Sequence, residues 1–461
     1  MTSVAIAAST GTAGSDIVQF VRTLSFDALP IDVVQQAQRC LLDLIGVAAA
    51  GSRTRASAIA RAYAATQLCG RGNEARMLFD GRRASSIGAA FAGATTIDAF
   101  DAHDGHVLTK GHAGVAILPA LLALADLQAD DAPSVDAREF LACIVLGYEV
   151  ATRAGIALHA SVPDYHCSGA WNGIGAAAVA ARILRLTATQ TREAFGVAEY
   201  FGVRGQMLRT CDYPSMVKDG SGMGAQVGLT AAWLTRDGFT GAPAVTMEHA
   251  DQHALWSDLG ARWRIREQYF KAYPVCRWAQ PAVEAVVDLQ RAHRFNADDV
   301  LEIGIETFRE AVALGSGCVI PATTEDAQYS LPYAVAGVLV FGGIGAQEVE
   351  TAAIGNPRVR RLLRCMTLRE DRKFSASFPA ERWARATLRL TDGRVLRSEP
   401  ARARGNPENP LADEVLRTKY RELATPVVGD ARAARIERLV ESLSHAGSVS
   451  PLLDELLRAT V

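Results

Sequence analysis

Two charge-poor runs, residues 86–94 and 115–125, enclose a short segment that is dense in ionisable groups. Both runs consist almost entirely of small and apolar residues, so they predict helices buried in a protein interior. The segment between them holds three aspartates, three histidines and a lysine: Asp98, Asp101, Asp104, His103, His106, His112 and Lys110. Burying such groups costs free energy, which folds accept mainly where chemistry is done. We therefore interpret residues 98–114 as the wall of a pocket, in preference to a solvated turn.

The overall charge points to a small ligand. The 461 residues carry a formal net charge of −2, and no run of lysine or arginine indicates binding to nucleic acid or to a membrane surface. No stretch reaches the roughly 18 apolar residues of a membrane span, and the amino terminus lacks the pattern of a signal peptide. Eight cysteines are scattered without a C-x-x-C pair, which is typical of reduced thiols. We expect a cytoplasmic protein that binds a small anion.

The pattern of apolar residues predicts mainly helices in the first half of the chain. A helix is expected to begin at Pro30 and to end near Gly51, because apolar residues recur at helical spacing between them. Alanine-rich stretches such as residues 175–184 have strong helix propensity and allow close packing of helices. Near Trp263 the composition changes. Residues 301–308 and 386–391 alternate apolar with polar residues and predict strands, and Asp392-Gly393 predicts a hairpin turn.

These patterns predict a fold that is mainly α with an α+β part. We expect a large all-helical domain in residues 1–269 and a smaller α/β lid domain in residues 270–402. Helical patterns return in residues 403–461, which are expected to rejoin the helical domain.

Two further segments place a polar residue before a helix. Residues 163–175 contain His166 and a glycine pattern, but a helix precedes them where a dinucleotide loop needs a strand, and no acid follows at the ribose-binding offset. We exclude a nucleotide site there. Residues 213–224 place Lys218 in a glycine-rich approach to a helix without the full phosphate-loop spacing. Lys218 could meet a carboxylate at that helix start, or it could be an exposed loop lysine.

Two segments of the second half are also candidates. Lys271, Cys276 and Arg277 lie among aromatic residues at the expected junction of the two domains, where buried cations would need an anion such as a carboxylate. Cys276 alone is weak support for a nucleophile, and a buried structural thiol explains it better. Tyr333 opens an apolar helix and could donate a proton or a hydrogen bond, or belong to the core.

Taken together, the order and spacing of several motifs resemble those of the MmgE/PrpD family over nearly the whole chain. The motifs are Leu42-Asp43-Leu44-Ile45-Gly46, the Asp98–His112 loop followed by Leu118-Pro119-Ala120, Gly147-Tyr148-Glu149-Val150, Tyr165-His166, Met216-Val217-Lys218, Lys271-Ala272-Tyr273-Pro274-Val275-Cys276-Arg277-Trp278, Ala327-Gln328-Tyr329-Ser330-Leu331-Pro332-Tyr333 and Asn406-Pro407-Glu408-Asn409-Pro410. The family includes 2-methylcitrate dehydratases, cis-aconitate decarboxylases and iminodisuccinate epimerases. The resemblance implies a helical domain with an α/β lid, a homodimer, and no metal or organic cofactor.

The resemblance also implies a set of site residues. They are the catalytic candidates Asp98, His112, His166, Lys218, Lys271 and Tyr333. The resemblance does not give a role to His103, and we add His103, Cys276 and Arg277 as candidates for binding substrate. The chain departs from the family pattern at Ala102, where relatives often have threonine, and at Cys276, where decarboxylases have histidine. The loop from Asp98 to His112 also looks longer than in those enzymes.

The candidate residues suit removal of a proton next to a carboxylate. Lys218, Lys271 and Arg277 could stabilise the developing negative charge, while His112 and His166 could serve as base and acid. Asp98 would orient or polarise a partner, and Tyr333 could donate a proton. We expect a lyase that dehydrates or, as second choice, decarboxylates a small di- or tricarboxylic acid, with epimerisation as an alternative. Two other hypotheses stay open: a metal site formed by Asp101, His103, Asp104, His106 and His112, and a binding module without catalysis.

Overall fold

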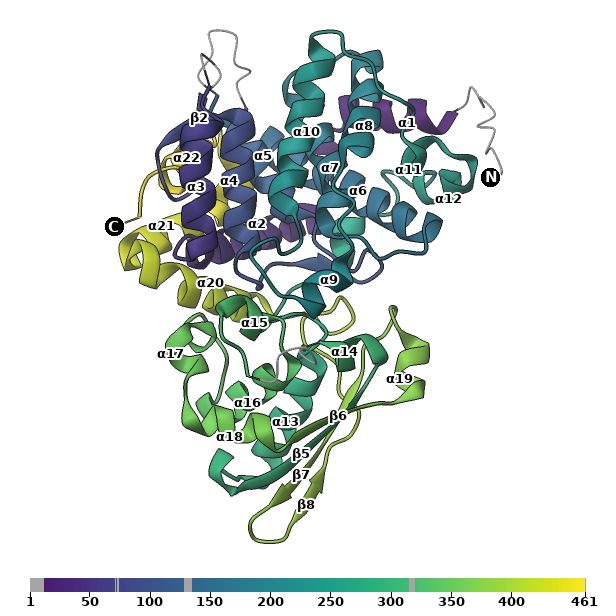
Figure 1. Cartoon of the computed structure of the whole chain (residues 1–461). Coiled ribbons are helices and arrows are strands. Elements are labelled where there is room, and N and C mark those ends of the chain that lie inside the picture. Colours follow the sequence, from purple (N-terminus) through teal and green to yellow (C-terminus); the bar gives the residue numbers. More distant parts are fainter. Residues whose placement is uncertain (1–11, 71, 73, 128–134, 315–319, 461) are drawn as a thin grey trace.

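The computed structural model describes residues 12–70, 72, 74–127, 135–314 and 320–460 of the chain. Figure 1 shows a helical part and, beneath it, a part in which helices accompany a four-stranded sheet. The fold class predicted from the sequence, mainly α with an α+β part, is therefore confirmed.

The helical part follows the chain from α1 to β4. Its helices are α1 (Thr12–Thr23), α2 (Ile31–Gly51), α3 (Arg55–Gln67), α4 (Ser86–Asp98), α5 (Gly114–Ala125), α6 (Ala137–Ser161), α7 (Asn172–Ile183), α8 (Ala188–Phe201), α9 (Met207–Asp212), α10 (Ser221–Arg236), α11 (Val245–Glu248) and α12 (His253–Trp256). Its short strands are β1 (Glu74–Arg76), β2 (Arg83–Ser85), β3 (Gly105–His106) and β4 (Gln268–Tyr269).

The second part contains the larger sheet, and three helices end the chain. The elements are α13 (Gln280–His293), β5 (Val300–Thr307), α14 (Arg309–Ala313), α15 (Thr324–Gln328), α16 (Leu331–Phe341), α17 (Thr351–Ile354), α18 (Pro357–Arg364), β6 (Met366–Glu370), α19 (Arg372–Ser377), β7 (Ala384–Leu390) and β8 (Val395–Arg397), followed by α20 (Asp413–Val428), α21 (Asp430–Ser442) and α22 (Ser450–Leu456).

Helices α4 and α5 are interior helices, as their sequences predict. In α5 every residue from Gly114 to Leu124 is buried, and α4 packs against α5 and α10. The helix expected from Pro30 to Gly51 is also confirmed, because α2 begins directly after Pro30 and ends at Gly51. Helix α6 is the one helix in the described part of the chain with the length and apolar character of a membrane span, but 94% of its apolar window is buried within the protein. Such burial is typical of a core helix.

The larger sheet has the strand order β6-β5-β7-β8. Strand β5 pairs in parallel with β6 and antiparallel with β7, which confirms the two strands predicted from alternation. Strands β7 and β8 form the expected hairpin, in which Gly393 has a φ of +88° that few other residues adopt. Helices α13 and α18 pack on the strands and bury the apolar side of the sheet.

The C-terminal helices return to the helical part. Helix α20 packs along α2, and the yellow and purple ribbons lie side by side in Figure 1. Lys419 of α20 donates hydrogen bonds of 2.6 Å to both the Asp43 carboxylate and the backbone oxygen of Ala102. This helix therefore helps to fix the loop that follows α4. The domain boundaries expected at residues 269 and 402 stay a prediction.

Candidate active site

The loop between α4 and α5 is folded against β4, where the helical part of the chain ends. Strand β3 in this loop pairs antiparallel with β4, which places Gly105 opposite Tyr269. A side chain at Gly105 would collide with the Tyr269 hydroxyl and with Nδ1 of His112, so the close approach requires glycine. His106 bonds Glu267 through Nε2 at 2.9 Å and anchors the same pairing. The loop is therefore held beside Tyr269, which precedes Lys271 by two positions in the chain.

His112 is held in the form that can accept a proton. Its Nδ1–H donates to the backbone oxygen of Asp104, which leaves the lone pair on Nε2. Burial, together with the Lys271 ammonium, lowers the pKa of His112 below its ordinary value, so the ring is neutral at pH 7. Nε2 lies 3.5 Å from the carboxylate of Asp219, which would stabilise the ring once it is protonated.

Asp104 and Tyr148 support this arrangement from behind. The Tyr148 hydroxyl donates to the Asp104 carboxyl group at 2.5 Å, and both side chains are completely buried. The backbone oxygen of Asp104 accepts the hydrogen bond from Nδ1–H of His112. The bond between Tyr148 and Asp104 therefore restrains the ring of His112 indirectly. Burial raises the pKa of Asp104 to about 7. Asp104 therefore positions the base and does not face the cavity described below.

Asp98 and His103 form a second pair beside His112. The backbone N–H of Ser221, the first residue of α10, donates to Oδ2 of Asp98 at 3.1 Å. Oδ1 has no hydrogen-bond partner among the described residues and lies 3.8 Å from Nε2 of His103. Burial raises the pKa of Asp98 to about 8, and the neighbouring Asp219 carboxylate adds to the rise. Asp98 is therefore mostly a neutral carboxylic acid at pH 7.

His103 is also neutral. Its Nδ1–H donates to the backbone oxygen of Phe100 at 3.3 Å, and its ring centroid lies 4.1 Å from that of His112. Burial and the neighbouring His112 ring lower the pKa of His103 well below its ordinary value. Nε2 is left as an acceptor that faces Asp98, so a proton on Asp98 can point toward it.

The cationic half of the site contains two lysines. Lys271 Nζ lies 2.6 Å from Oδ1 of Asp101, and both side chains are buried. Burial by itself would raise the pKa of Asp101 and lower that of Lys271, but their mutual attraction holds the two groups charged. Lys218 donates to Oε1 of Gln328 at 2.7 Å and lies 4.9 Å from the ring centroid of Tyr329. Burial lowers the pKa of Lys218.

Gln328, in α15, links the two halves of the site. Its Oε1 accepts from both Lys218 and the backbone N–H of Asp101 at 2.8 Å, while its amide nitrogen donates to Thr324. The side chain is completely buried. One amide from the second part of the chain thus fixes both the loop after α4 and the lysine before α10.

A cavity of about 20 Å³ lies at the seam of the two parts, within this cluster. Its polar lining includes the cations Lys110, Lys271, Arg277 and Arg382, the carboxylates Asp101 and Asp219, His112, and the phenols Tyr165, Tyr269 and Tyr329. The cations outnumber the carboxylates, so the cavity attracts anions. Its volume is enough for about one water molecule, so an organic acid enters only if the walls separate.

The structure brings most of the predicted site residues together. Asp98, His103, His112, Lys218 and Lys271 form the cluster described above. Arg277 lines the cavity with its guanidinium 4.5 Å from the Tyr269 ring, and burial lowers its pKa to about 10, which leaves it charged at pH 7. Cys276 lines the cavity too, and burial raises the pKa of its thiol to about 12, so it is neutral. A neutral thiol fits the structural role preferred from the sequence.

Two predicted residues lie elsewhere. The Tyr333 hydroxyl donates to the backbone oxygen of Glu348, and Tyr333 does not line the cavity, where Tyr329 is found instead. Helix α16 is buried on all sides, so its sequence could not indicate which face meets the site. His166 is buried beside His159, to whose Nε2 its backbone N–H donates at 3.2 Å, and it does not line the cavity either.

Sequence reasoning missed several residues of the site. Asp219 directly follows the candidate Lys218. Gln328 and Tyr329 precede the candidate Tyr333 within the motif Ala327–Tyr333. Arg382 carries no local signal, because only the tertiary fold brings it to the cavity, where it donates to the backbone oxygen of Val107 at 3.1 Å. For Asp101 the sequence suggests only the role of a metal ligand.

Two groups of described residues could hold a metal ion, each with ligand atoms within 4.8 Å of one another. They are Asp101, His103 and His112, and Asp98, His103 and Asp219. However, Asp101 is already paired with Lys271, and Lys218 acts on both Asp98 and Asp101. A divalent cation would meet two ammonium groups, so the cluster fits a resident metal poorly and fits an anionic substrate well.

Comparisons with known proteins match one protein family along most of the chain. The family model of the MmgE/PrpD N-terminal domain matches residues 15–258, and that of the MmgE/PrpD C-terminal domain matches residues 273–445. The chain is 26% identical over 479 residues to the cis-aconitate decarboxylase-like protein oryM of Aspergillus oryzae, covering 96% of this chain and 97% of that protein. It is 24% identical to the cis-aconitate decarboxylase of Aspergillus terreus (97% and 96% covered) and 25% identical to the human cis-aconitate decarboxylase (91% and 89% covered).

Proposed function

The chain belongs to the MmgE/PrpD family, and from this premise we propose that it is a lyase that removes water from a small hydroxylated di- or tricarboxylic acid. One observation carries the proposal. A neutral base, His112, and a neutral carboxylic acid, Asp98, lie in the same buried cluster as the charged Lys271, so general base, general acid and carboxylate anchor coexist near pH 7.

The anchors would act first. Lys271, Arg277 and Arg382 would bind carboxylates of the substrate, with the planar guanidinium groups suited to bidentate contacts. Fixed positive charge next to the reacting carbon would lower the free energy of the developing carbanion, because the site is shielded from water.

The elimination would then need one base and one acid. Nε2 of His112 takes the proton from the carbon next to a carboxylate, and the electron pair of that C–H bond becomes the second bond of the new alkene. The C–O bond to the leaving hydroxyl breaks, and the hydroxyl leaves as water with the proton of Asp98. His112 then returns its proton to solvent and Asp98 recovers one.

Decarboxylation is the second candidate, because the relatives compared above are named as cis-aconitate decarboxylases or as similar to them. In that reaction the C–C bond to a carboxylate breaks, carbon dioxide leaves, and the resulting carbanion takes a proton from an acid such as Asp98. A base is not required. The two reactions therefore differ in their need for His112.

A substrate panel tests the proposal. Methylcitrate, citrate, cis-aconitate and iminodisuccinate are incubated with the full-length protein in deuterated water and followed by proton NMR. We expect loss of water from a citrate, and we expect His112→Asn to slow it about 10²- to 10⁴-fold. Release of carbon dioxide from cis-aconitate that survives His112→Asn would favour the decarboxylase. Exchange of solvent deuterium without a new product would indicate an epimerase, and no reaction with any acid would favour the non-catalytic module.

A further inference from the structure

The cations that line the small cavity of about 20 Å³ differ in what they already bind. Lys271 is paired with Asp101 at 2.6 Å. Arg277 donates through both terminal nitrogens to oxygen atoms of the protein. Lys110 and Arg382 line the same cavity, and neither has an ion-pair partner among the described residues. These two side chains therefore have the most hydrogen-bond donors left for a ligand.

Arg382 is buried although most of its donors are unused. Its side chain is 8% exposed, and its Nη2 donates to the backbone oxygen of Val107 at 3.1 Å. The buried Nε has no hydrogen-bond partner in the part of the chain that the structure describes. Glu381 and Glu408 share a neighbouring cavity of about 10 Å³ with Arg382, but both are paired with Arg402. A buried guanidinium without a counterion costs free energy, so this one points to an anionic ligand.

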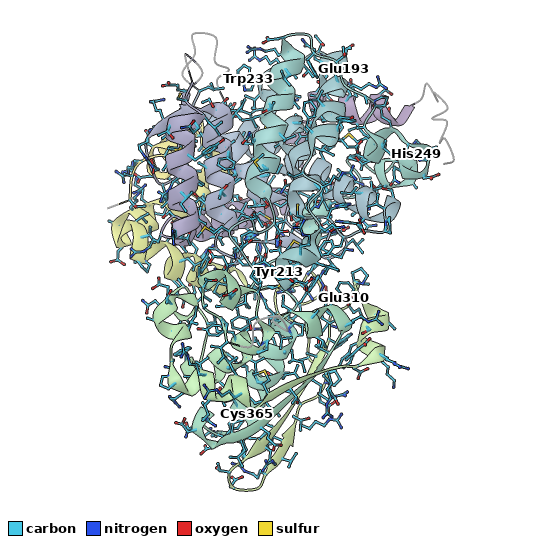
Figure 2. The ribbon with its side chains drawn as sticks, in the orientation of Figure 1. Glu193, Tyr213, Trp233, His249, Glu310 and Cys365 are labelled. Atoms are coloured by element: carbon cyan, nitrogen blue, oxygen red, sulfur yellow. The ribbon has the colours of Figure 1, made fainter. Side chains whose placement is uncertain are left out.

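Lys110 meets Arg382 from the other part of the chain. Lys110 lies in the loop between α4 and α5, whereas Arg382 lies in the segment between α19 and β7. Nζ of Lys110 lies 4.5 Å from the centroid of the Tyr165 ring. Burial lowers the pKa of Lys110, and the Arg382 guanidinium adds to the fall, so the two like charges repel each other. Glu310, labelled in Figure 2, attracts Lys110 but forms no ion pair with it.

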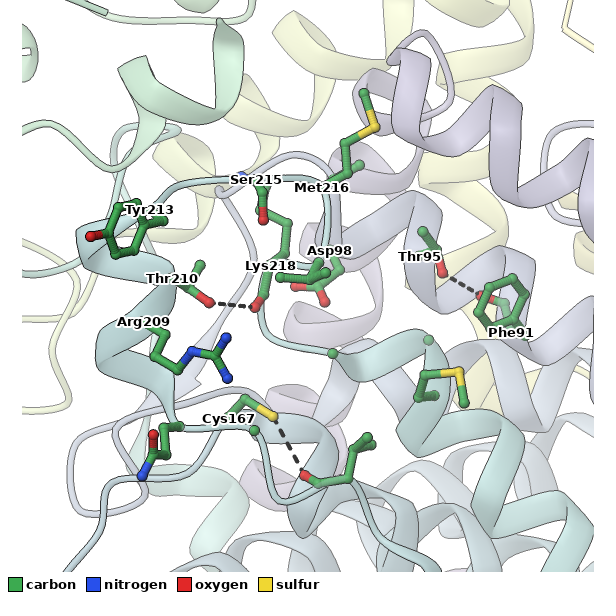
Figure 3. A pocket seen from close by; sticks show the side chains of 18 residues that line it. Phe91, Thr95, Asp98, Cys167, Arg209, Thr210, Tyr213, Ser215, Met216 and Lys218 are labelled. Atoms are coloured by element: carbon green, nitrogen blue, oxygen red, sulfur yellow. Dashed lines mark hydrogen bonds between the residues drawn. The ribbon is translucent and has the colours of Figure 1, made fainter. Parts of the chain in front are cut away.

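The large cavity of the structure has no comparable cations. It has a volume of about 690 Å³ and lies between α4, α9 and the start of α10 (Figure 3). Its cationic lining consists of Lys218 and Arg209, both labelled in Figure 3. Lys218 donates to Gln328 at 2.7 Å, and Arg209 is exposed to solvent. The buried cations that lack a partner therefore lie at the seam of the two parts.

We propose that Lys110 and Arg382 form a clamp for a second carboxylate of the substrate, remote from the reacting carbon, and that this clamp selects against acids with one carboxylate. The proposal rests on the proposed function, in which Lys271 binds the carboxylate next to the reacting carbon. Arg382 can offer two parallel N–H groups, and Lys110 adds a point charge. A carboxylate between them replaces their repulsion by two attractions. It also joins the two parts of the chain across the seam.

The test removes one charge from the ligand and one from the protein. Succinate and its monoamide, succinamate, have nearly the same size, and titration calorimetry gives their dissociation constants with the full-length protein. The wild-type protein should bind succinate about 10- to 100-fold more tightly than succinamate. This ratio should fall toward one in Arg382→Gln and should also fall in Lys110→Gln. Arg385→Gln is the matched control, because Arg385 is paired with Glu306 outside the cavity, and it should keep the wild-type ratio.

Unfolding in urea separates a clamp from a structural role. Because the two cations lack a counterion in the free protein, neither variant should lower the midpoint, and succinate should stabilise the wild-type protein more than the variants. If Arg382→Gln does not fold, Lys110→Gln decides the test.

Several results would overturn the clamp. They are equal binding of the two acids to the wild-type protein, no binding of either, and an unchanged ratio in the variants, with or without a lower urea midpoint. An equal fall of the ratio in Arg385→Gln would assign the effect to overall charge and would overturn it too. The expected fall in Arg382→Gln together with no turnover of any acid would support the clamp while contradicting the proposed lyase.

Discussion

Two aspartates three residues apart, Asp98 at the end of α4 and Asp101 in the loop that follows, are both buried but have different charge states. Burial raises the pKa of Asp98 to about 8, because its nearest charged neighbours include another carboxylate, Asp219. Asp101 meets Lys271 at 2.6 Å, and Lys271 and Lys218 hold its pKa below its ordinary value despite burial. The charged neighbour of each carboxyl group, and not how deeply the group is buried, therefore decides whether it is ionised. A neutral acid and a charged carboxylate with different functions can therefore lie three residues apart in the chain.

The largest effect is expected where the charged pair is broken. Lys271→Met would leave Asp101 buried without its partner, which costs about 3–5 kcal/mol of stability, and would also remove a carboxylate anchor. We expect a lower midpoint in urea unfolding and loss of turnover. The double variant Lys271→Met with Asp101→Asn should recover most of the stability but not the activity. An equal loss of stability in the double variant would show that packing, and not the charge pair, is responsible.

Loss of the base should be nearly as severe for turnover but mild for stability. His112→Asn removes the group that takes the proton, and the loss of a general base lowers kcat about 10²- to 10⁴-fold. His166→Asn is the matched control, because His166 is also buried but lies outside the small cavity, so a smaller fall is expected. Steady-state kinetics on the best substrate of the panel provides the measurement. An equal fall in both variants would restore the role that the family resemblance implies for His166.

The neutral state of Asp98 predicts a pH dependence. Only the protonated acid can deliver a proton, so kcat should fall as the pH rises through about 8. Because the folded-state pKa of Asp98 is raised, folding takes up a proton, and the destabilisation from Asp98 should grow from about pH 4 upward until it is complete above about pH 8. Asp98→Asn should reduce kcat and make stability less dependent on pH across this window. A rate that is flat from pH 7 to 9 would contradict a protonated Asp98.

The fold was largely accessible from the sequence because its signals are local. Helix α2 and strands β5 and β7 follow from periodicity, and the hairpin follows from Asp392-Gly393. The pairing of β3 with β4 was not accessible, since strands of two residues, separated by more than 160 positions, leave no pattern.

The site was predictable only in part. Asp98 is indicated by the polar segment between two charge-poor runs, and Lys218 by the glycine-rich approach to a helix. Gln328 and Arg382 act through long-range contacts that no local spacing encodes. Tyr333 is a candidate because of the family resemblance, whereas Tyr329 lies in the turn between α15 and α16, where no local pattern indicates that its side chain lines the cavity.

The smallest effect is expected from removal of metal ions. Dialysis against EDTA should leave turnover unchanged, because Lys271 already neutralises Asp101 and Asp98 is mostly uncharged at pH 7. The remaining atoms near His103 would therefore offer a divalent cation few anionic ligands, beside two ammonium groups that repel it. Elemental analysis of the purified protein provides the second measurement. A stoichiometric metal that is lost together with activity, and that restores activity when added back, would contradict the difference in charge between Asp98 and Asp101. Asp98 would then be an ionised metal ligand, and another residue would have to supply the proton of the reaction.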